Sequence, residues 1–156
     1  RDHPAAARMM ELADEAATLR AGAALADAVR AGDVVTLSGA LGAGKTTFAR
    51  GLLGALGLVG EAPSPTFAIV QTYAPPETRL PVAHIDLYRL EHPDEAEELG
   101  LAELRHDHLL LVEWPERLPA STCEQALRLR LTVTAAGGRC LTAEVPAAWG
   151  ARWPLP

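Results

Sequence analysis

Residues 39–46 have the sequence GALGAGKT, which matches the phosphate-loop pattern G-x-x-x-x-G-K-[ST] at every specified position. The β-branched run 33–38 precedes the loop and indicates a buried strand, and apolar residues at helical spacing follow from Lys45 to Leu56. Backbone N–H groups of such a loop converge on a phosphate, and the helix N-terminus adds a favourable dipole. We therefore expect the chain to bind ATP or a closely related nucleotide through Gly39, Leu41, Gly42, Ala43, Gly44, Lys45, Thr46 and Thr47.

Lys45 is the only lysine of the chain, whereas the other 13 of its 14 basic residues are arginines. A compact ammonium fits between phosphates where a guanidinium would be too broad. We expect Lys45 to reach the β- and γ-phosphates and the Thr46 hydroxyl to bind Mg²⁺. The alternative is a flexible glycine turn that matches the pattern by chance.

Two carboxylates follow apolar strands and are candidates for the acid that a phosphate loop needs beside the metal. Glu113 ends the run Leu109 to Val112, and Asp86 ends the run Val82 to Ile85. We expect one of these two carboxylates to lie near the metal, and Asp86 or Glu113 to orient the attacking water. Either one could instead be an ordinary carboxylate at a strand end. Thr66, in Ser64-Pro65-Thr66, is either a threonine that senses the γ-phosphate or part of a plain turn.

The rest of the chain predicts an α/β sandwich of three layers, typical of P-loop NTPases. Two glycines, Gly137 and Gly138, separate strands that should form a closing antiparallel hairpin. The mixed sheet should be parallel near the loop. One domain over residues 1–156, with irregular termini, is the simplest organisation for this length, and Trp149 and Trp153 should pack on the surface. Further strands are expected at 8–12, 67–73, 81–87, 109–113, 127–133 and 140–145, and helices at 14–30 and from 93 to Gly100.

Charge and hydropathy restrict the function classes. The net charge of -6 disfavours tight direct binding to a phosphate backbone, so any nucleic acid should be held by a partner. No run approaches the roughly 20 apolar residues that cross a bilayer, and the first residues have no long apolar signal core. The two cysteines, Cys123 and Cys140, have neither redox nor zinc spacing. We expect a cytoplasmic protein without a membrane partner.

Four separated segments together resemble one family. They are LSGALGAGKTTFARGLLGALG (37–57), SPTF (64–67), HIDLYRL (84–90) and LVEWPERL (111–118). Over about Ala17 to Glu144 the chain is similar to the bacterial ATPase of tRNA threonylcarbamoyladenosine biosynthesis, called TsaE. HIDLYRL and VEWPE after such a loop are highly specific in combination.

The resemblance implies a small cytoplasmic P-loop ATPase with weak activity alone. It implies two partners, a threonylcarbamoyl transferase subunit that modifies adenosine 37 of tRNA and its paralogous scaffold subunit, with tRNA reached indirectly through the complex. ATP hydrolysis is expected to reset this complex between turnovers. Carried onto this chain, the resemblance implies that Glu113 helps to hold Mg²⁺ and that Asp86 lies near the γ-phosphate. It also implies that Trp114 borders the nucleotide and that Thr18 and Arg139 contact it. Ala40 departs from the acidic residue that many members have there, which puts in doubt any partner contact or catalytic tuning by that residue.

Two other functions remain open. A P-loop kinase for a small molecule would transfer the γ-phosphate to a metabolite and would usually carry clustered arginines in a lid, whereas the arginines here are scattered. A non-enzymatic protein would use ATP only to lock a binding surface, and would then tolerate a non-hydrolysable analogue through repeated cycles.

Overall fold

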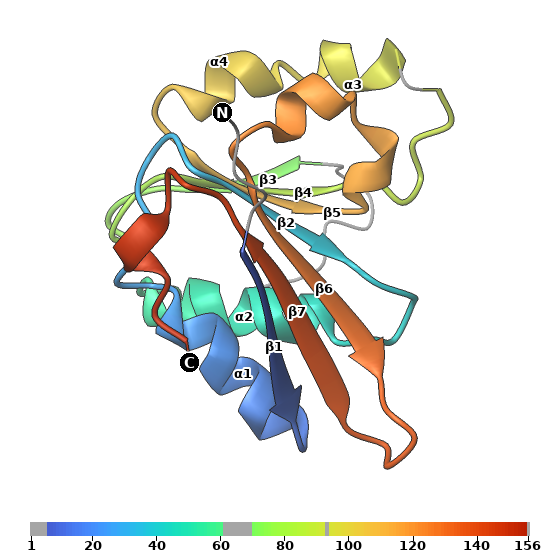
Figure 1. Cartoon of the computed structure of the whole chain (residues 1–156). Helices are drawn as coiled ribbons and strands as arrows, with labels where there is room; N and C mark the ends of the chain where they lie inside the picture. The colour runs from blue at the N-terminus through green and yellow to red at the C-terminus, as the bar shows by residue number, and fades with distance from the viewer. Residues whose placement is uncertain (1–5, 61–69, 93, 156) are drawn as a thin grey trace.

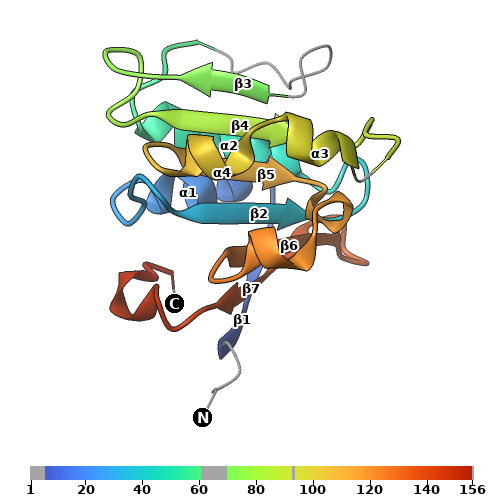
Figure 2. The same cartoon turned by 90° about the horizontal axis from the view of Figure 1, so that it is seen from above.

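The computed structural model describes residues 6–60, 70–92 and 94–155. Within them, seven strands form one sheet in the order β1-β7-β6-β2-β5-β4-β3 (Figure 2). In chain order the elements are β1 (Ala6–Leu12), α1 (Glu15–Ala24), β2 (Val34–Ser38), α2 (Lys45–Ala55), β3 (Val70–Tyr73), β4 (Val82–Asp86), α3 (Asp94–Glu98), α4 (Leu101–Arg105), β5 (Leu109–Glu113), β6 (Leu127–Val133) and β7 (Arg139–Val145), with short 3₁₀ turns at Pro115–Arg117, Ala120–Cys123 and Gly150–Arg152.

The sheet is mixed, as the sequence predicts. Its centre is parallel, because β2 pairs with β5 and β6, and β5 pairs with β4, all in the same direction. Its edges are antiparallel: β6 and β7 form the predicted C-terminal hairpin, β1 adds to β7, and β3 adds to β4. This arrangement brings β2, β5 and β4 side by side, so that the segments after their carboxyl ends meet at one edge of the sheet.

Helices cover both faces of the sheet and complete the three layers. Figure 1 shows α1 and α2 against one face and α3 and α4 against the other. Successive residues of β5 alternate between the two cores: Leu109 and Leu111 belong to the cluster under α1 and α2, and Leu110 and Val112 to the opposite one. A strand buried on both faces has an unbroken apolar sequence for this reason.

Helices α1 and α2 cross in backbone contact. A Cβ atom added at Gly51 would lie 2.1 Å from the carbonyl oxygen of Leu19, and one at Gly22 would lie 2.1 Å from that of Phe48. No side chain fits at either position. This close approach holds Thr18 of α1 beside the phosphate loop, 3.6 Å from where a Cβ of Gly44 would lie.

The first helix is shorter than predicted. Asp14 caps it as expected, because its carboxylate accepts a hydrogen bond of 2.8 Å from the Ala17 N–H. The helix was predicted to reach Arg30, but α1 ends at Ala24. A series of tight turns follows, and the guanidinium of Arg79 donates to the carbonyl of Ala26. Tertiary contacts therefore end this helix before Gly32 does.

Two further predictions need correction. The helix expected up to Gly100 ends at Glu98, and a second short helix, α4, follows Gly100. Trp149 is not a surface residue: it is only 2% exposed and belongs to the core cluster. The C-terminal segment folds back because Arg152 binds Asp33 through two hydrogen bonds of 2.8 and 3.0 Å and covers the Trp149 ring at 4.3 Å.

The predicted strand 67–73 is observed as β3 from Val70, and its first three residues lie outside the described part of the chain. No helix in the described part is long and apolar enough to cross a membrane.

Candidate nucleotide-binding site

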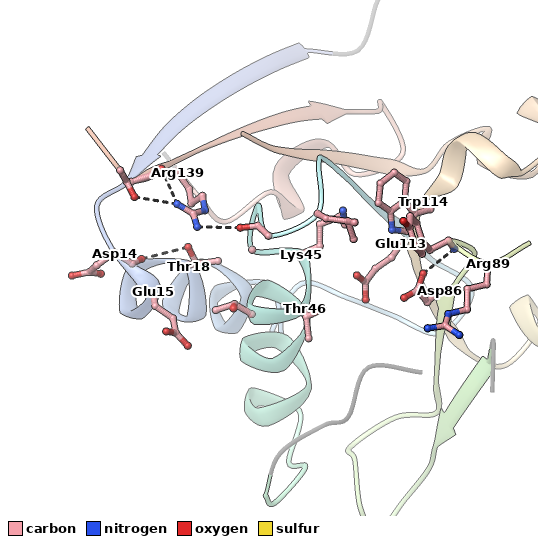
Figure 3. Close-up of a pocket in the computed structure, with 17 residues that line it drawn as sticks. Asp14, Glu15, Thr18, Lys45, Thr46, Asp86, Arg89, Glu113, Trp114 and Arg139 are labelled. Atoms are coloured by element: carbon pink, nitrogen blue, oxygen red, sulfur yellow. Dashed lines mark hydrogen bonds between the residues drawn. The ribbon is translucent and has the colours of Figure 1, made fainter. Parts of the chain in front are cut away.

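A pocket of about 780 Å³ opens where the carboxyl ends of β2, β4 and β5 meet (Figure 3). Open α/β sheets bind their ligands at this edge. Three separate parts of the chain complete its wall: the start of α1, the phosphate loop with the start of α2, and the turn before β7. The lining residues are Asp14, Glu15, Thr18, Leu41, Gly42, Gly44, Lys45, Thr46, Thr47, Asp86, Tyr88, Arg89, Glu113, Trp114, Gly137, Gly138 and Arg139.

The loop from Gly39 to Gly44 joins β2 directly to α2, which is the predicted strand, loop and helix unit. Gly39 has a φ of 141°, and a Cβ there would lie 2.4 Å from the carbonyl oxygen of Leu131 on β6. Only glycine can turn the chain here against the neighbouring strand. Gly44, also at positive φ, precedes the first turn of α2, so the amino end of this helix faces the pocket.

Lys45 lies at the floor of the pocket and is only 5% exposed. Its ammonium donates hydrogen bonds to the carbonyl oxygens of Gly39 and, at 3.2 Å, Ala40, and it lies 4.0 Å from the centre of the Trp114 ring. Burial lowers the pKa of Lys45, while the nearby charges of Glu113, Asp86 and Glu116 oppose this shift. The Lys45 ammonium therefore lies among carbonyl groups, an aromatic face and carboxylates.

Asp86 and Glu113 are register partners at the ends of the adjacent parallel strands β4 and β5, and both line the pocket. Oδ1 of Asp86 accepts a hydrogen bond of 3.0 Å from the Tyr88 N–H, which closes a tight turn after the strand. Burial raises the pKa of Asp86, and the charge of Glu113 adds to the rise, against the hydrogen bond from Tyr88 and the charges of His84 and Lys45. The two carboxylates thus face the same space as Lys45.

Glu113 is buried and has a partner that the sequence analysis missed. Its Oε2 lies 2.6 Å from Nε2 of His84, which is two residues before Asp86 on β4. The signal was present in the sequence, because residues 84 and 86 of one strand point to the same face of the sheet. His84 could therefore have been predicted as a site residue, because it lies two positions before Asp86.

Trp114 and Tyr88 form an aromatic wall on the carboxylate side of the pocket. Their ring centres are 4.9 Å apart with the planes inclined at 43°. Trp114 has a left-handed backbone, with φ of 62°, and its N–H donates to the carbonyl of Leu37 at 3.2 Å. This contact ties the segment after β5 to the end of β2, next to the loop.

Arg139 closes the opposite side of the pocket by contacts with backbone. Its guanidinium donates to the carbonyl oxygens of Ala43, Gly42, Gly137 and Gly138, each at 3.1 Å. The side chain therefore joins the phosphate loop to the turn of the β6–β7 hairpin. Thr18, buried behind the loop, also lines the pocket.

The structure gathers most of the predicted residues in one place. Asp86, Glu113, Lys45, Thr46, Thr47, Thr18, Trp114, Arg139, Leu41, Gly42 and Gly44 all line the pocket. Gly39 and Ala43 lie behind them and act through their carbonyls, which accept from Lys45 and Arg139. Thr66 falls outside the described residues. Asp14, Glu15, Tyr88, Arg89, Gly137 and Gly138 also line the pocket and were not predicted as site residues.

A strand, glycine loop and helix with this lysine and threonine, in a mixed sheet covered on both faces, define the P-loop NTPase class of protein. Comparison with known families identifies the particular branch. Residues 12–141 match the family described as "Threonylcarbamoyl adenosine biosynthesis protein TsaE", and the chain belongs to that family.

Relatives support this assignment in sequence and in structure. The chain is 42% identical over 139 residues to the tRNA threonylcarbamoyladenosine biosynthesis protein TsaE of Streptomyces coelicolor, with 80% of this chain and 94% of that protein covered. It is 42% identical over 119 residues to the protein of the same name from Bacillus subtilis, covering 69% and 73%. The crystal structure of Bacillus subtilis YdiB superposes with a TM-score of 0.78 at 29% identity, over 97% of this chain and 94% of that one.

Proposed function

We propose that this chain is a Mg²⁺-dependent ATPase that supports a protein complex forming N6-threonylcarbamoyladenosine at position 37 of tRNA. The observation that carries the proposal is the single pocket in which the loop lysine, the loop threonine and two strand-end carboxylates meet. A nucleotide triphosphate with its metal needs this combination of backbone amides, one ammonium and oxygen ligands.

The residues at this pocket fit Mg²⁺ and a triphosphate. The hydroxyl of Thr46 and the carboxylates of Glu113 and Asp86 are oxygen donors, the kind that Mg²⁺ prefers. The amino end of α2 favours an anion, and Lys45 adds a positive charge that burial leaves poorly hydrated. We assign Thr46 and Glu113 to the metal, and Lys45 with the loop from Gly39 to Thr47 to the phosphates.

Held by Thr46 and Glu113, Mg²⁺ would neutralise charge on the phosphates, and the other steps are assigned to side chains of the protein. Lys45 stabilises the negative charge that spreads over the γ-phosphate oxygens. Asp86 or Glu113 holds the attacking water in line, and the raised pKa of Asp86 suits a group that accepts a proton. Trp114 and Tyr88 line the pocket on the side of the two carboxylates with aromatic rings.

The surroundings of the triphosphate follow from the same pocket. Trp114 borders the nucleotide, and Thr18 lies on the side of α1. Arg139 was expected to contact the nucleotide directly, but its donors face backbone carbonyls. We therefore propose that Arg139 holds the shape of the loop as well as lining the pocket.

The proposed partners are a threonylcarbamoyl transferase subunit and its paralogous scaffold subunit, in the cytoplasm. The names of the Streptomyces and Bacillus relatives support a place in this tRNA modification. A net charge of -6 supports an indirect approach to tRNA, because direct binding depends on clustered basic residues. The chain would act on its partners and leave contact with the tRNA to them.

The test combines calorimetry and turnover. Titration with ATP in the presence of Mg²⁺ should give saturable binding, and phosphate release should rise when both partner proteins are added. With tRNA and threonylcarbamoyl-adenylate, the number of modified tRNAs per complex should exceed one only when ATP is hydrolysed. Absence of binding would refute the proposal. Transfer of labelled γ-phosphate to a metabolite, with little free phosphate, would indicate a kinase instead.

A further inference from the structure

We infer that His84 is a positioning residue for Glu113: it holds one carboxylate oxygen so that the other is presented to the Mg²⁺ of the bound nucleotide. The inference rests on the proposed function, since it assigns Glu113 to the metal. It adds a residue from β4 that takes part in neither the loop motif nor the pair of strand-end carboxylates.

The contact between the side chains of His84 and Glu113 is short and buried. Nε2 of His84 lies 2.6 Å from Oε2 of Glu113, and the side chains are 1% and 3% exposed. A carboxylate that binds a metal ion can only accept hydrogen bonds, so the assignment of Glu113 to Mg²⁺ makes Nε2 of His84 the donor. Charge-assisted hydrogen bonds of this length are strong and directional. The imidazole therefore fixes where Oε2 lies.

The other ring nitrogen has no competing role. Nδ1 of His84 is buried and has no hydrogen-bond partner among the described residues. A buried polar atom without a partner costs free energy, so apolar packing alone does not explain an imidazole at this position. Glu113 is thus the one polar group in the described chain that holds this ring.

Strand geometry makes the arrangement rigid. On the parallel pair β4 and β5, Asp86 lies beside Glu113 and His84 beside Leu111. Alternation along β4 sends His84 and Asp86 to the same face, with the histidine deeper under the sheet edge. Strand β4 thereby supplies Asp86 at the pocket. Behind Asp86 it supplies His84, which supports Glu113 of the neighbouring strand β5.

Support of this kind affects metal binding in a way that can be measured. Partners that orient a ligating side chain typically contribute about 10- to 100-fold to metal affinity. Without His84, the buried Glu113 carboxylate would have no hydrogen-bond donor among the residues that the structure describes, and it could rotate away from the metal position. Loss of His84 should therefore weaken metal binding and leave the contacts of the loop with phosphate unchanged.

The experiment uses Mn²⁺ as a spectroscopic substitute for Mg²⁺, titrated by electron paramagnetic resonance into the full chain with ATP. The variants are His84→Leu, which removes the donor, and His84→Gln, whose amide N–H can replace Nε2. His108→Leu is the matched control, because His108 precedes β5 at the opposite end of the sheet and contacts Asp107. ATP affinity in EDTA is measured in parallel by calorimetry, and folding by thermal unfolding.

We expect His84→Leu to weaken Mn²⁺ binding in the ATP complex at least tenfold, with ATP affinity in EDTA changed less than twofold. His84→Gln should recover most of the loss, and His108→Leu should match the wild type. Equal Mn²⁺ affinity in His84→Leu and wild type would overturn the inference, as would an equal loss with and without metal that glutamine does not recover. If the wild type itself binds no ATP, the proposed function fails instead.

Discussion

The ammonium of Lys45 lies 4.0 Å from the centre of the Trp114 ring, so the lysine of the phosphate loop and the residue after β5 share one contact. A cation over an indole is stabilised by about 0.5–2 kcal/mol. The contact joins the phosphate loop to the segment VEWPE, which is distant from it in the sequence. Two consequences can be tested.

Binding of nucleotide should change the fluorescence of Trp114, because its cationic neighbour would then contact phosphate. The change should disappear in Trp114→Phe, and Trp149→Phe should retain it, since Trp149 packs under Arg152 outside the pocket. Lys45→Ala should lower nucleotide affinity about 100-fold or more, the scale of losing two charge-assisted hydrogen bonds. A Trp114→Phe variant that kept the full signal would disprove the assignment of this reporter.

Glu113→Ala should reduce ATP hydrolysis far more than it reduces nucleotide binding. We expect phosphate release to fall about 100-fold or more, with nucleotide affinity within a few fold of the wild type, because the loop contacts remain. The variant should also lose about 1–3 kcal/mol of unfolding free energy, since His84 would be buried without its acceptor. Single-turnover phosphate release, calorimetry and urea unfolding measure the three quantities separately. Normal turnover would contradict the role.

Arg139→Ala should disturb the phosphate loop without removing any charge from the core. The carbonyls of Gly42 and Ala43 would lose their donor, and we expect nucleotide affinity to fall about tenfold. Arg128→Ala is the control, because Arg128 is exposed and pairs with Glu144 at 3.5 Å on the outer side of the same hairpin. Calorimetric titration of both variants is the measurement, and equal affinities would exclude a function for Arg139 in the loop.

Asp86→Asn should increase the stability of the fold while reducing hydrolysis. Burial raises the pKa of Asp86 above its ordinary value of 3.8, so the ionised carboxylate destabilises the folded state at neutral pH. As the pH falls through the raised pKa, the carboxyl takes up a proton in the folded state and this penalty disappears. The stabilisation by asparagine, measured by urea unfolding, should therefore be full at neutral pH and decrease toward pH 3.8. A pH-independent difference would argue against this cause.

Gly51→Ala should destabilise the protein by about 1–3 kcal/mol, because the added methyl group would meet the carbonyl of Leu19 and push α1 from α2. Gly54→Ala, one turn later in α2, has no atom within 4 Å of the added Cβ. There the gain in helix propensity should stabilise by about 0.5–1 kcal/mol. Opposite signs for the two substitutions, measured by urea unfolding, are the expected result. Equal effects would show that the helix crossing is looser than the structure has it.

Local sequence was sufficient for the phosphate loop, the strands that flank it and the hairpin. The loop glycines, Lys45 and Thr46 are consecutive, and their geometry depends on the neighbouring strand and helix alone. Asp86 and Glu113 could be selected because each follows an apolar strand, and parallel strands end at a common edge. Thr18 and Arg139 entered only through the family resemblance, and the structure shows that both line the pocket.

Contacts between distant segments decided what the sequence left open. The order of the strands depends on pairing between distant segments, and the hydrogen bonds from His84 to Glu113 and from Arg139 to Gly42 join residues 29 and 97 positions apart. Periodicity describes which face of an element is apolar, but it carries no information about which element packs there. The burial of Trp149 and the early end of α1 have the same origin in long-range contacts. Arg152 folds the C-terminal segment back by binding Asp33, which is 119 positions away, and Arg79 binds the carbonyl of Ala26.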